Sequence, residues 1–340
     1  MRELFAKIYK DKLTLTAVII LIILYLGIML ADFLAPYDKH FADRNLSYAP
    51  PSNIYIINEK GKLSAPYTYN WVKTFDSKSL TINFYQDRSQ KYYLKFFKNG
   101  KLLSLENGGK LFLLGTDING RDNFSRILYG GRISLTIGFL ALFITFPIGL
   151  IYGGISGYFG GKVDIIMMRL AEAIMSIPSF YLLIILASIL PSSMTSAERF
   201  SLIVVLLAFI GWAGLARVVR GMVLSIKTED YVKSAISLGA SKFRIIMKHI
   251  LPQTSSYVIV AITLLTPSYI LSESGLSFLG LGIQQPDASW GNMLKEAQEF
   301  TNIISRPWLL TPGFLIFLAV LSFNILGDTI RDFLDPKNKN

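Results

Sequence analysis

Six apolar runs alternate with more polar segments along this chain of 340 residues. They occupy about Leu13–Leu34, Ile133–Tyr158, Ile165–Leu190, Ser201–Val219, Tyr257–Leu281 and Leu309–Ile330. A helix of about 20 apolar residues can cross a bilayer with all of its backbone hydrogen bonds made internally. The pattern therefore predicts six membrane-spanning helices. The first is predicted to be an uncleaved anchor, because the apolar core of a secretory signal is shorter, at ~7–15 residues.

Glycines and prolines modify several of these runs. Two overlapping GxxxG steps lie on one face of the second run, where they predict the close approach of another helix: Gly149, Gly153 and Gly157. Prolines interrupt three runs and predict kinks against neighbouring helices: Pro147, Pro178 and Pro267.

The long segment Pro36–Gly131, between the first two runs, has a strand-like pattern. Apolar and polar residues alternate over 80–85 and 92–97, and Asn99-Gly100 is a strong signal for a two-residue hairpin turn. Ile54–Ile57 followed by Lys60-Gly61 predicts another turn. We expect a small β-rich insert. A disordered linker is the alternative, which the high aromatic content disfavours.

Composition agrees with a membrane protein. Charged residues make up 17% and apolar residues 52% of the chain, which is too little polar surface for a soluble enzyme of two ordinary domains. Cysteine is absent and there are two histidines, His40 and His249, so disulfides, thiol nucleophiles, cysteine zinc sites and histidine-rich metal sites are excluded. The lipid bilayer is the expected environment, and no basic stripe separate from the helix ends indicates nucleic acid.

The distribution of basic residues predicts the orientation. Lys and Arg near the ends of the runs number fifteen on one side, Arg2, Lys337 and Lys339 among them, and three on the other. Because cytoplasmic flanks carry the excess of Lys and Arg, both termini and the segment Arg217–His249 are predicted to be cytoplasmic. Pro36–Gly131 then lies outside.

Catalytic patterns do not stand out. Two Gly-Lys dipeptides, Gly109-Lys110 and Gly161-Lys162, resemble the end of a phosphate-binding loop, but neither is followed by the required Ser or Thr. We therefore expect no nucleotide hydrolysis by this chain. Asp117-x-Asn119-Gly120 fits an Asx-turn better than a calcium loop. No metal site, resident cofactor or enzymatic activity is expected.

Charged residues within or near the runs are costly in a membrane and are candidates for function. They are Arg169, Glu172, Arg217, Glu273 and Asp328. Glu273 lies deepest, and two interpretations stay open for it: a role in a transport path or gate, and a structural partner to another helix or subunit.

The cytoplasmic segment predicts two short helices joined at a glycine. Thr228 is a plausible N-cap for a helix that ends near Leu238, and Gly239 suits its C-terminal stop. Ser241 is predicted to cap a second helix, Lys242–Ile250, which Pro252 would end. An amphipathic loop lying on the membrane is the alternative.

This segment resembles the inner-membrane permease subunits of bacterial dipeptide and oligopeptide ABC importers. Their pattern Tyr-Val-x-x-Ala-x-x-Leu-Gly-Ala-Ser is intact over Tyr231–Ser241. The general importer signature is looser, with Lys233 in place of its Glu, Ser234 in place of its first Ala and His249 in place of its Ile. The resemblance marks these as coupling-loop residues: Tyr231, Lys233, Ala235, Gly239, Ala240, Ser241, His249, Leu251 and Pro252.

Two further stretches resemble the same family in the expected order. One runs from Leu114 to Leu135 and the other from Leu271 to Leu294. The first carries the extracytoplasmic family motif Gly115, Thr116, Asp117, Gly120, Arg121, Asp122, Ser125 and Arg126. The resemblance covers the first run and about Leu111–Pro336, and leaves out about 48–110.

The resemblance implies an all-α polytopic protein with the six-helix bundle of a type I importer permease. Residues 1–35 would be the N-terminus and first helix, 36–131 the β-rich extracytoplasmic insert, and 132–340 a five-helix core with the coupling loop at 220–252. Expected partners are a second, related permease, two cytoplasmic ATPase subunits that carry ATP and magnesium, and an external substrate-binding protein. Peptides are the expected substrate. Nickel, opines and sugars, or a secondary transporter, are alternatives, as is a membrane-anchored receptor or enzyme.

Overall fold

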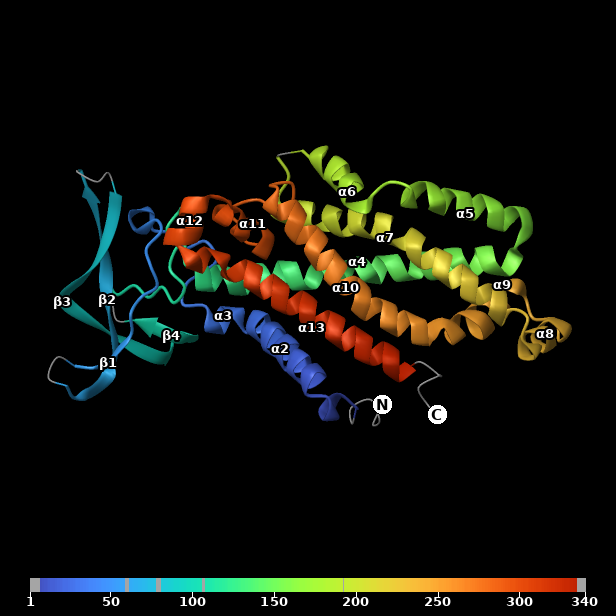
Figure 1. The fold of residues 1–340 in the computed structure, drawn as a ribbon, viewed down its shortest axis with the longest axis horizontal. Helices are drawn as coiled ribbons and strands as arrows, with labels where there is room; N and C mark the ends of the chain where they lie inside the picture. The colour runs from blue at the N-terminus through green and yellow to red at the C-terminus, as the bar shows by residue number, and fades with distance from the viewer. Residues whose placement is uncertain (1–6, 59–60, 78–80, 106–107, 192, 335–340) are drawn as a thin grey trace. The chain divides into compact units, whose positions relative to one another are not determined.

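The computed structural model describes residues 7–58, 61–77, 81–105, 108–191 and 193–334. The basic residues Arg2, Lys337 and Lys339, together with Lys60 and Leu80 of the predicted insert, lie outside these ranges. The α-helices are α2 (Lys12–Met29), α3 (Ala31–Leu34), α4 (Asn123–Phe159), α5 (Gly161–Met175), α6 (Ser179–Ser188), α7 (Ser196–Ile226), α8 (Asp230–Ser237), α9 (Lys242–Arg244), α10 (Ser255–Phe278), α11 (Trp290–Leu294), α12 (Phe300–Ser305) and α13 (Thr311–Leu334) (Figure 1).

Short 3-10 helices and one π-helix connect several of these elements. They are η1 (Arg44–Leu46), the π-helix η2 (Ile245–Ile250), η3 (Leu251–Thr254), η4 (Lys295–Gln298) and η5 (Pro307–Leu310). The four strands are β1 (Tyr55–Ile57), β2 (Leu63–Asp76), β3 (Thr81–Lys98) and β4 (Lys101–Leu105).

The helices confirm the predicted polytopic class. Among the residues described, five helices are long and apolar enough to cross a membrane, or six if the bent pair α5 and α6 forms one span. That pair bends by 76°, and Pro178 lies at the break, as the proline pattern predicts. Pro147 and Pro267, by contrast, lie inside continuous helices. Helix α4 begins at Asn123, ten residues before the predicted run.

The chain forms two compact units, and both draw on separated stretches. One contains Met1–Leu21, Leu135–Leu276 and Leu318–Asn340, and the other contains Ile22–Ser134 and Ser277–Phe317. The division into 1–35, 36–131 and 132–340 stays a prediction.

In the first unit, the glycine face of α4 packs directly on α7, which confirms the predicted close approach. A Cβ built at Gly153 would lie 2.4 Å from the carbonyl oxygen of Ala216, and one at Gly157 would lie 2.8 Å from that of Arg220. Contacts this short leave no room for a methyl group. Backbone packing of this kind is the main source of helix association in lipid, where apolar burial supplies little driving force.

A polar lock secures the adjoining turn between α4 and α5. Gly160 and Gly161 have φ of 64° and 54°, which a turn this tight requires. Asp164, in the first turn of α5, accepts hydrogen bonds from Ser156 at 2.5 Å and from Nε of Arg220 at 2.9 Å. One carboxylate therefore ties α4, α5 and α7 together.

In the second unit, the predicted β-rich insert is an antiparallel sheet in the order β1-β2-β3-β4 (Figure 1). Asn99 and Gly100 have φ of 55° and 73°, as the two-residue turn between β3 and β4 requires. The described residues of the two predicted pieces, 81–85 and 92–97, fall in one strand, and Gln86 and Asp87 between them also pair with β2. Strand β2 was not predicted beyond Leu63, although Tyr67–Phe75 is rich in aromatic and β-branched residues.

The sheet is joined to the segments that flank it by an apolar core. Leu46, Ala49 and Phe112 are buried, and Trp71 and Phe84 of the sheet pack on them. Tyr37 stacks on Phe41 and on Phe112 with ring centroids 4.0 and 5.6 Å apart, and its hydroxyl accepts a hydrogen bond from the amide of Leu111. The insert is thus an ordered part of this unit, and the alternative of a disordered linker is wrong.

We expect Gly153→Ala to lower the thermal midpoint of the purified protein in detergent by several degrees. The added methyl group must move α7, and overpacking of this kind costs ~1–3 kcal/mol. Gly221→Ala on α7 is the matched control, because nothing lies within 4 Å of a Cβ at Gly221. Alanine is also the better helix former, so this control should keep or raise the midpoint. Equal losses in both variants would contradict the role of the glycine face.

Candidate functional site

The family motif of residues 115–126 contains a tight turn held by Asp117. Its Oδ1 atom accepts hydrogen bonds from the amides of Asn119 at 2.8 Å and Arg121 at 3.0 Å, which confirms the predicted Asx-turn. Gly120 has a φ of 69°, and a Cβ there would lie 1.8 Å from the carbonyl oxygen of Asp43. This position therefore requires glycine.

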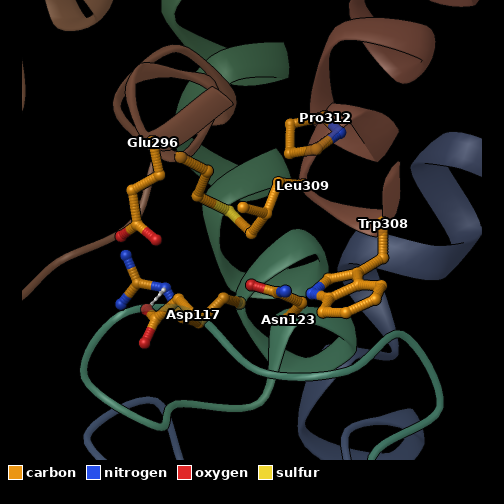
Figure 2. A pocket seen from close by; sticks show the side chains of 8 residues that line it. Asp117, Asn123, Glu296, Trp308, Leu309 and Pro312 are labelled. Carbon is orange, nitrogen blue, oxygen red and sulfur yellow. Dashed lines mark ion pairs between the residues drawn. The ribbon is translucent and has the colours of Figure 1, made fainter. Parts of the chain in front are cut away.

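Two buried arginines converge on Asp117. Its Oδ2 atom lies 2.6 Å from Nε of Arg121 and 3.4 Å from Nε of Arg126. Figure 2 shows the side chains of Asp117 and Glu296 directed toward a guanidinium group, which is that of Arg126, the arginine that lines the cavity. Glu296 Oε1 lies 3.8 Å from Arg121, and Oε2 accepts a hydrogen bond from the amide of Ile118. Gln285 accepts hydrogen bonds from both arginines.

The other motif residues also make local contacts that hold this part of the unit together. Thr116 donates to the carbonyl of Leu46 at 2.6 Å and accepts from the amide of Ala49 at 2.7 Å. Asp122 accepts from the amide of Ser125 at 2.8 Å at the start of α4. Gly115 has a φ of 61°, and a Cβ there would lie 2.8 Å from the carbonyl of Ala49.

The eight motif residues thus lie together in one cluster of contacts in the second unit. Residues that the sequence did not single out complete it: Gln285, Glu296 and Trp308. Trp308 donates from Nε1 to the carbonyl of Thr116 at 3.1 Å. No sequence spacing links these positions to Asp117, because they lie more than 160 residues away.

The cavity beside this network has a volume of about 10 Å³, and Asp117, Asn123, Arg126, Glu296 and Trp308 are among the residues that line it (Figure 2). That is room for about one water molecule. This cavity is too small for a substrate, and the acidic and basic side chains beside it pair with one another. Burial raises the pKa of Glu296 to about 7, and burial likewise raises that of Asp122 to about 7.

In the first unit, the predicted coupling loop forms a compact projection, here called the knob, from Asp230 to Thr254. Gly239 has a φ of 78°, and the amides of Gly239 and Ala240 donate to the carbonyls of Ile236 and Ala235. This is a Schellman C-cap, so the predicted stop at Gly239 is confirmed. The hydroxyl of Ser241 accepts a hydrogen bond from the amide of Arg244, which confirms the predicted second cap.

Two details of the predicted knob are wrong. The residue before α8 is Glu229, and Thr228 instead donates its hydroxyl to the carbonyl of Ser225 at the end of α7. The second helix does not end at Pro252. It passes through η2 and η3 into α10, so Lys242–Phe278 is helical without a break. Proline is tolerated there because it lies in the first turn of η3.

One face of the knob is anchored and the other is exposed. Val232, Ile245 and Ile250 are buried, and a Cβ at Gly154 of α4 would lie 3.3 Å from Ile246 and 3.2 Å from Leu251. Large apolar side chains occupy the exposed surface: Tyr231, Ile236, Leu238, Phe243 and Met247. An exposed apolar patch of this kind is typical of an interaction surface.

The remaining predicted coupling-loop residues lie on or beside this surface. Lys233, Ser241 and Pro252 are exposed, Ala235 is buried, and Ala240, His249 and Leu251 are half-buried. Lys233 pairs with Asp230 at 3.0 Å within α8.

A larger cavity of about 350 Å³ opens at the bend between α5 and α6. Hydroxyl groups and glycines line it together with apolar side chains: Ser179, Gly211, Gly214, Ser268, Tyr269 and Ser272. Tyr269 is hydrogen-bonded to Thr145 at 3.0 Å. Pro178, at the bend, was the only sequence signal for this cavity.

Glu273 does not line this cavity, although it follows Ser272 in α10. Its side chain is fully buried, and Ser274 donates a hydrogen bond to it at 3.4 Å. The path or gate role of Glu273 and its role as a structural partner both stay predictions.

Comparison with known proteins identifies the family. Residues 145–340 match the binding-protein-dependent transport system inner membrane components, and residues 1–51 match the N-terminal transmembrane domain of oligopeptide transport permease C. The chain belongs to the first of these families. It is therefore a multi-pass inner-membrane protein of a transport system, and the predicted resemblance to importer permeases is confirmed.

This transport-system component is similar to several named permeases. It is 47% identical to the dipeptide transport system permease protein of Bacillus subtilis over 225 residues, 66% of this chain and 68% of the relative. The oligopeptide transport system permease protein of Haemophilus influenzae is 44% identical over 226 residues, 66% and 70% of the two chains. The glutathione transport system permease protein of Pectobacterium atrosepticum is 40% identical over 227 residues, 67% and 73%.

The raised pKa of Glu296 predicts a pH-dependent contribution to the stability of this membrane component. The pKa of this carboxyl rises from 4.5 in the unfolded chain to about 7 in the folded protein. Between these two pH values the unfolded chain releases the proton more readily, so the folded state becomes less stable as the pH increases. Glu296→Gln keeps the shape and stays neutral. The thermal midpoint of the Glu296→Gln variant minus that of the wild type should therefore increase from pH 4.5 to pH 7 and then stay constant. A difference that does not vary with pH would contradict the assignment.

Proposed function

We propose that this chain is the permease subunit of an ATP-driven importer of small peptides. In this proposal a second, related permease completes the translocation path. Two cytoplasmic ATPase subunits carry ATP and magnesium, and an external binding protein delivers the substrate. The chain itself holds no resident cofactor, does not hydrolyse nucleotide and is a translocation subunit, not an enzyme.

The knob is the observation that carries the proposal. It combines a rigid Schellman turn at Gly239 with exposed apolar side chains, Leu238 and Phe243 above all. Such a surface fits a groove on a partner protein better than it fits water. The alternative of a loop lying on the membrane is less favoured, because α8 ends in a sharp turn and its buried face is already used within the unit.

Helix continuity supports a coupling role. Because Lys242–Phe278 is helical throughout, a displacement of the knob is carried along α10 without a flexible break. Ser268, Tyr269 and Ser272 of the same helix line the cavity at the α5–α6 bend. A π-helix lies between the two regions at Ile245–Ile250, and such wide turns are frequent at functional positions. Closure of the ATPases would thus reach the transport path.

The names of the relatives favour peptides over other solutes. They include dipeptide, oligopeptide and glutathione transport systems. Nickel, opines and sugars remain alternatives within the same kind of importer. A secondary transporter is less favoured, because it would not need an apolar docking surface like the knob.

We expect Gly239→Val to abolish uptake of a labelled dipeptide and co-purification of the ATPase subunits of the same system. A β-branched residue is strongly disfavoured at a φ of 78°, so the Schellman turn should be lost. Because nothing lies within 4 Å of a Cβ at Gly239, the effect reports backbone conformation alone.

Gly239→Asn is the matched control, since asparagine tolerates left-handed backbone, and it should retain most uptake and binding. The Leu238→Asp variant should no longer co-purify with the ATPase subunits. Its thermal midpoint should be unchanged, because the side chain of Leu238 is exposed. Normal uptake and normal binding in Gly239→Val would refute the coupling role. Competition by nickel, an opine or a sugar, but by no peptide, would refute the substrate class alone.

The proposal also fixes the orientation, with both termini in the cytoplasm and the sheet outside. The chain contains no cysteine, so single cysteines can be labelled without background. Asn99→Cys should react with an impermeant maleimide in intact spheroplasts. Ser241→Cys should react only after permeabilisation. Labelling of Ser241→Cys from outside would refute this topology.

A further inference from the structure

The turn between β3 and β4 lies beside the end of the first long helix. The phenyl ring of Phe97 is 6.0 Å from that of Phe33 in α3, and β4 packs against α3 (Figure 1). The residues Lys95–Lys101 around this turn are here called the hairpin tip. Phe33 follows α2 after a few residues, so the hairpin tip is held at a fixed level relative to a membrane-spanning helix.

The depth of Phe33 in the bilayer can be inferred from the length of the first apolar run. At ~1.5 Å per residue, the 22 residues of Leu13–Leu34 extend about 33 Å. The hydrocarbon core of a bilayer is ~30 Å thick, so Phe33 lies at its edge. Asp32, the residue before Phe33, forms an ion pair with Arg132 at 2.7 Å, and charged residues are favoured at the edge of the hydrocarbon core over its interior. The contact with Phe33 therefore predicts that Phe97 lies near the boundary between acyl chains and headgroups.

The hairpin tip is unusually apolar for an exposed turn, and it is also basic. Phe96 and Phe97 are 53% and 74% exposed. Phe97 also has a φ of 54°, which is costly for a bulky side chain. Lys95, Lys98 and Lys101 flank the two phenylalanines in the sequence, and no acidic residue occurs from Leu94 to Leu105.

We propose that the hairpin tip is an interfacial membrane anchor. Phe96 and Phe97 enter the headgroup layer of the leaflet on the side of the sheet, and the three lysines lie among anionic headgroups. Aromatic residues are enriched at this depth in membrane proteins. Lysine side chains close to an anionic membrane surface are attracted to it. The anchor would fix the sheet, and with it the rest of the insert, at a constant height above the bilayer.

The same sheet provides an internal comparison. At the other end of β3, Ile82 pairs with Phe75 of β2, and Phe75 is 62% exposed. Ile82 is fifteen residues from Phe97 along one strand, which is about 50 Å at ~3.3 Å per residue. The two ends are similarly exposed and aromatic. Among the described residues of the two ends, the hairpin tip packs against α3 at the end of the first apolar run, so this end is predicted to touch lipid.

The test uses the full-length protein in nanodiscs of phosphatidylcholine and phosphatidylglycerol at 3:1. Phe97→Cys and Phe75→Cys are each labelled with bimane, and a fraction of the lipid carries a headgroup nitroxide. We expect bimane at position 97 to be quenched at least threefold more than bimane at position 75. Equal quenching would overturn the proposal, as would quenching at neither position, which would instead indicate a protein partner for the hairpin tip.

A second arm separates the aromatic contact from the charge contact. In the Phe97→Cys protein, Lys98→Glu should reduce quenching in the mixed bilayer and leave it nearly unchanged in pure phosphatidylcholine. Lys73→Glu, on an exposed part of β2, should change neither. Equal effects of Lys98→Glu in both lipids would overturn the proposed contact with anionic headgroups. An unchanged thermal midpoint in each variant shows that the sheet is intact, and Phe96→Cys replaces Phe97→Cys if it is not.

Discussion

The direct contact of α4 with α7 along the glycine face is the interaction on which the first unit depends. Lipid supplies little reason for two apolar helices to associate, so close backbone packing has to supply it. Gly153 and Gly157 allow the backbone of α7 to approach within contact distance. The same contact brings Arg220 to Asp164, which fixes the turn into α5. Next to this face, Gly154 receives the side chains that anchor the knob.

The knob and the cavity at the α5–α6 bend are related through a single helix. Wide and tight turns at η2 and η3 change the helical pitch, yet the helix does not end between Lys242 and Phe278. Rigid helices transmit displacement, whereas loops absorb it. Pro178 provides the opposite property at the bend, where a break in the helix opens space lined with hydroxyl groups. Helix α10 thus connects the knob to the cavity at the broken helix without an intervening loop.

Buried charge has a different purpose in the second unit. Asp117, Arg121, Arg126 and Glu296 neutralise one another around a cavity that holds about one water molecule. Removing one partner from such a set would leave an uncompensated buried charge, which is strongly destabilising. The motif residues therefore hold segments of the second unit in place through contacts that lie far apart in the sequence.

The sequence by itself determined the features that depend on neighbouring residues. Apolar runs identified the spanning helices, Asn99-Gly100 identified the hairpin, and Gly239 identified the reversal in the knob, because each is a local demand of the backbone. Tertiary structure decided what depends on distant residues. Glu296 meets Arg121, and Trp308 meets Thr116, through folding alone. The helix continues through Pro252, against its local signal, because the proline falls in the first turn of η3, where its missing amide hydrogen costs little.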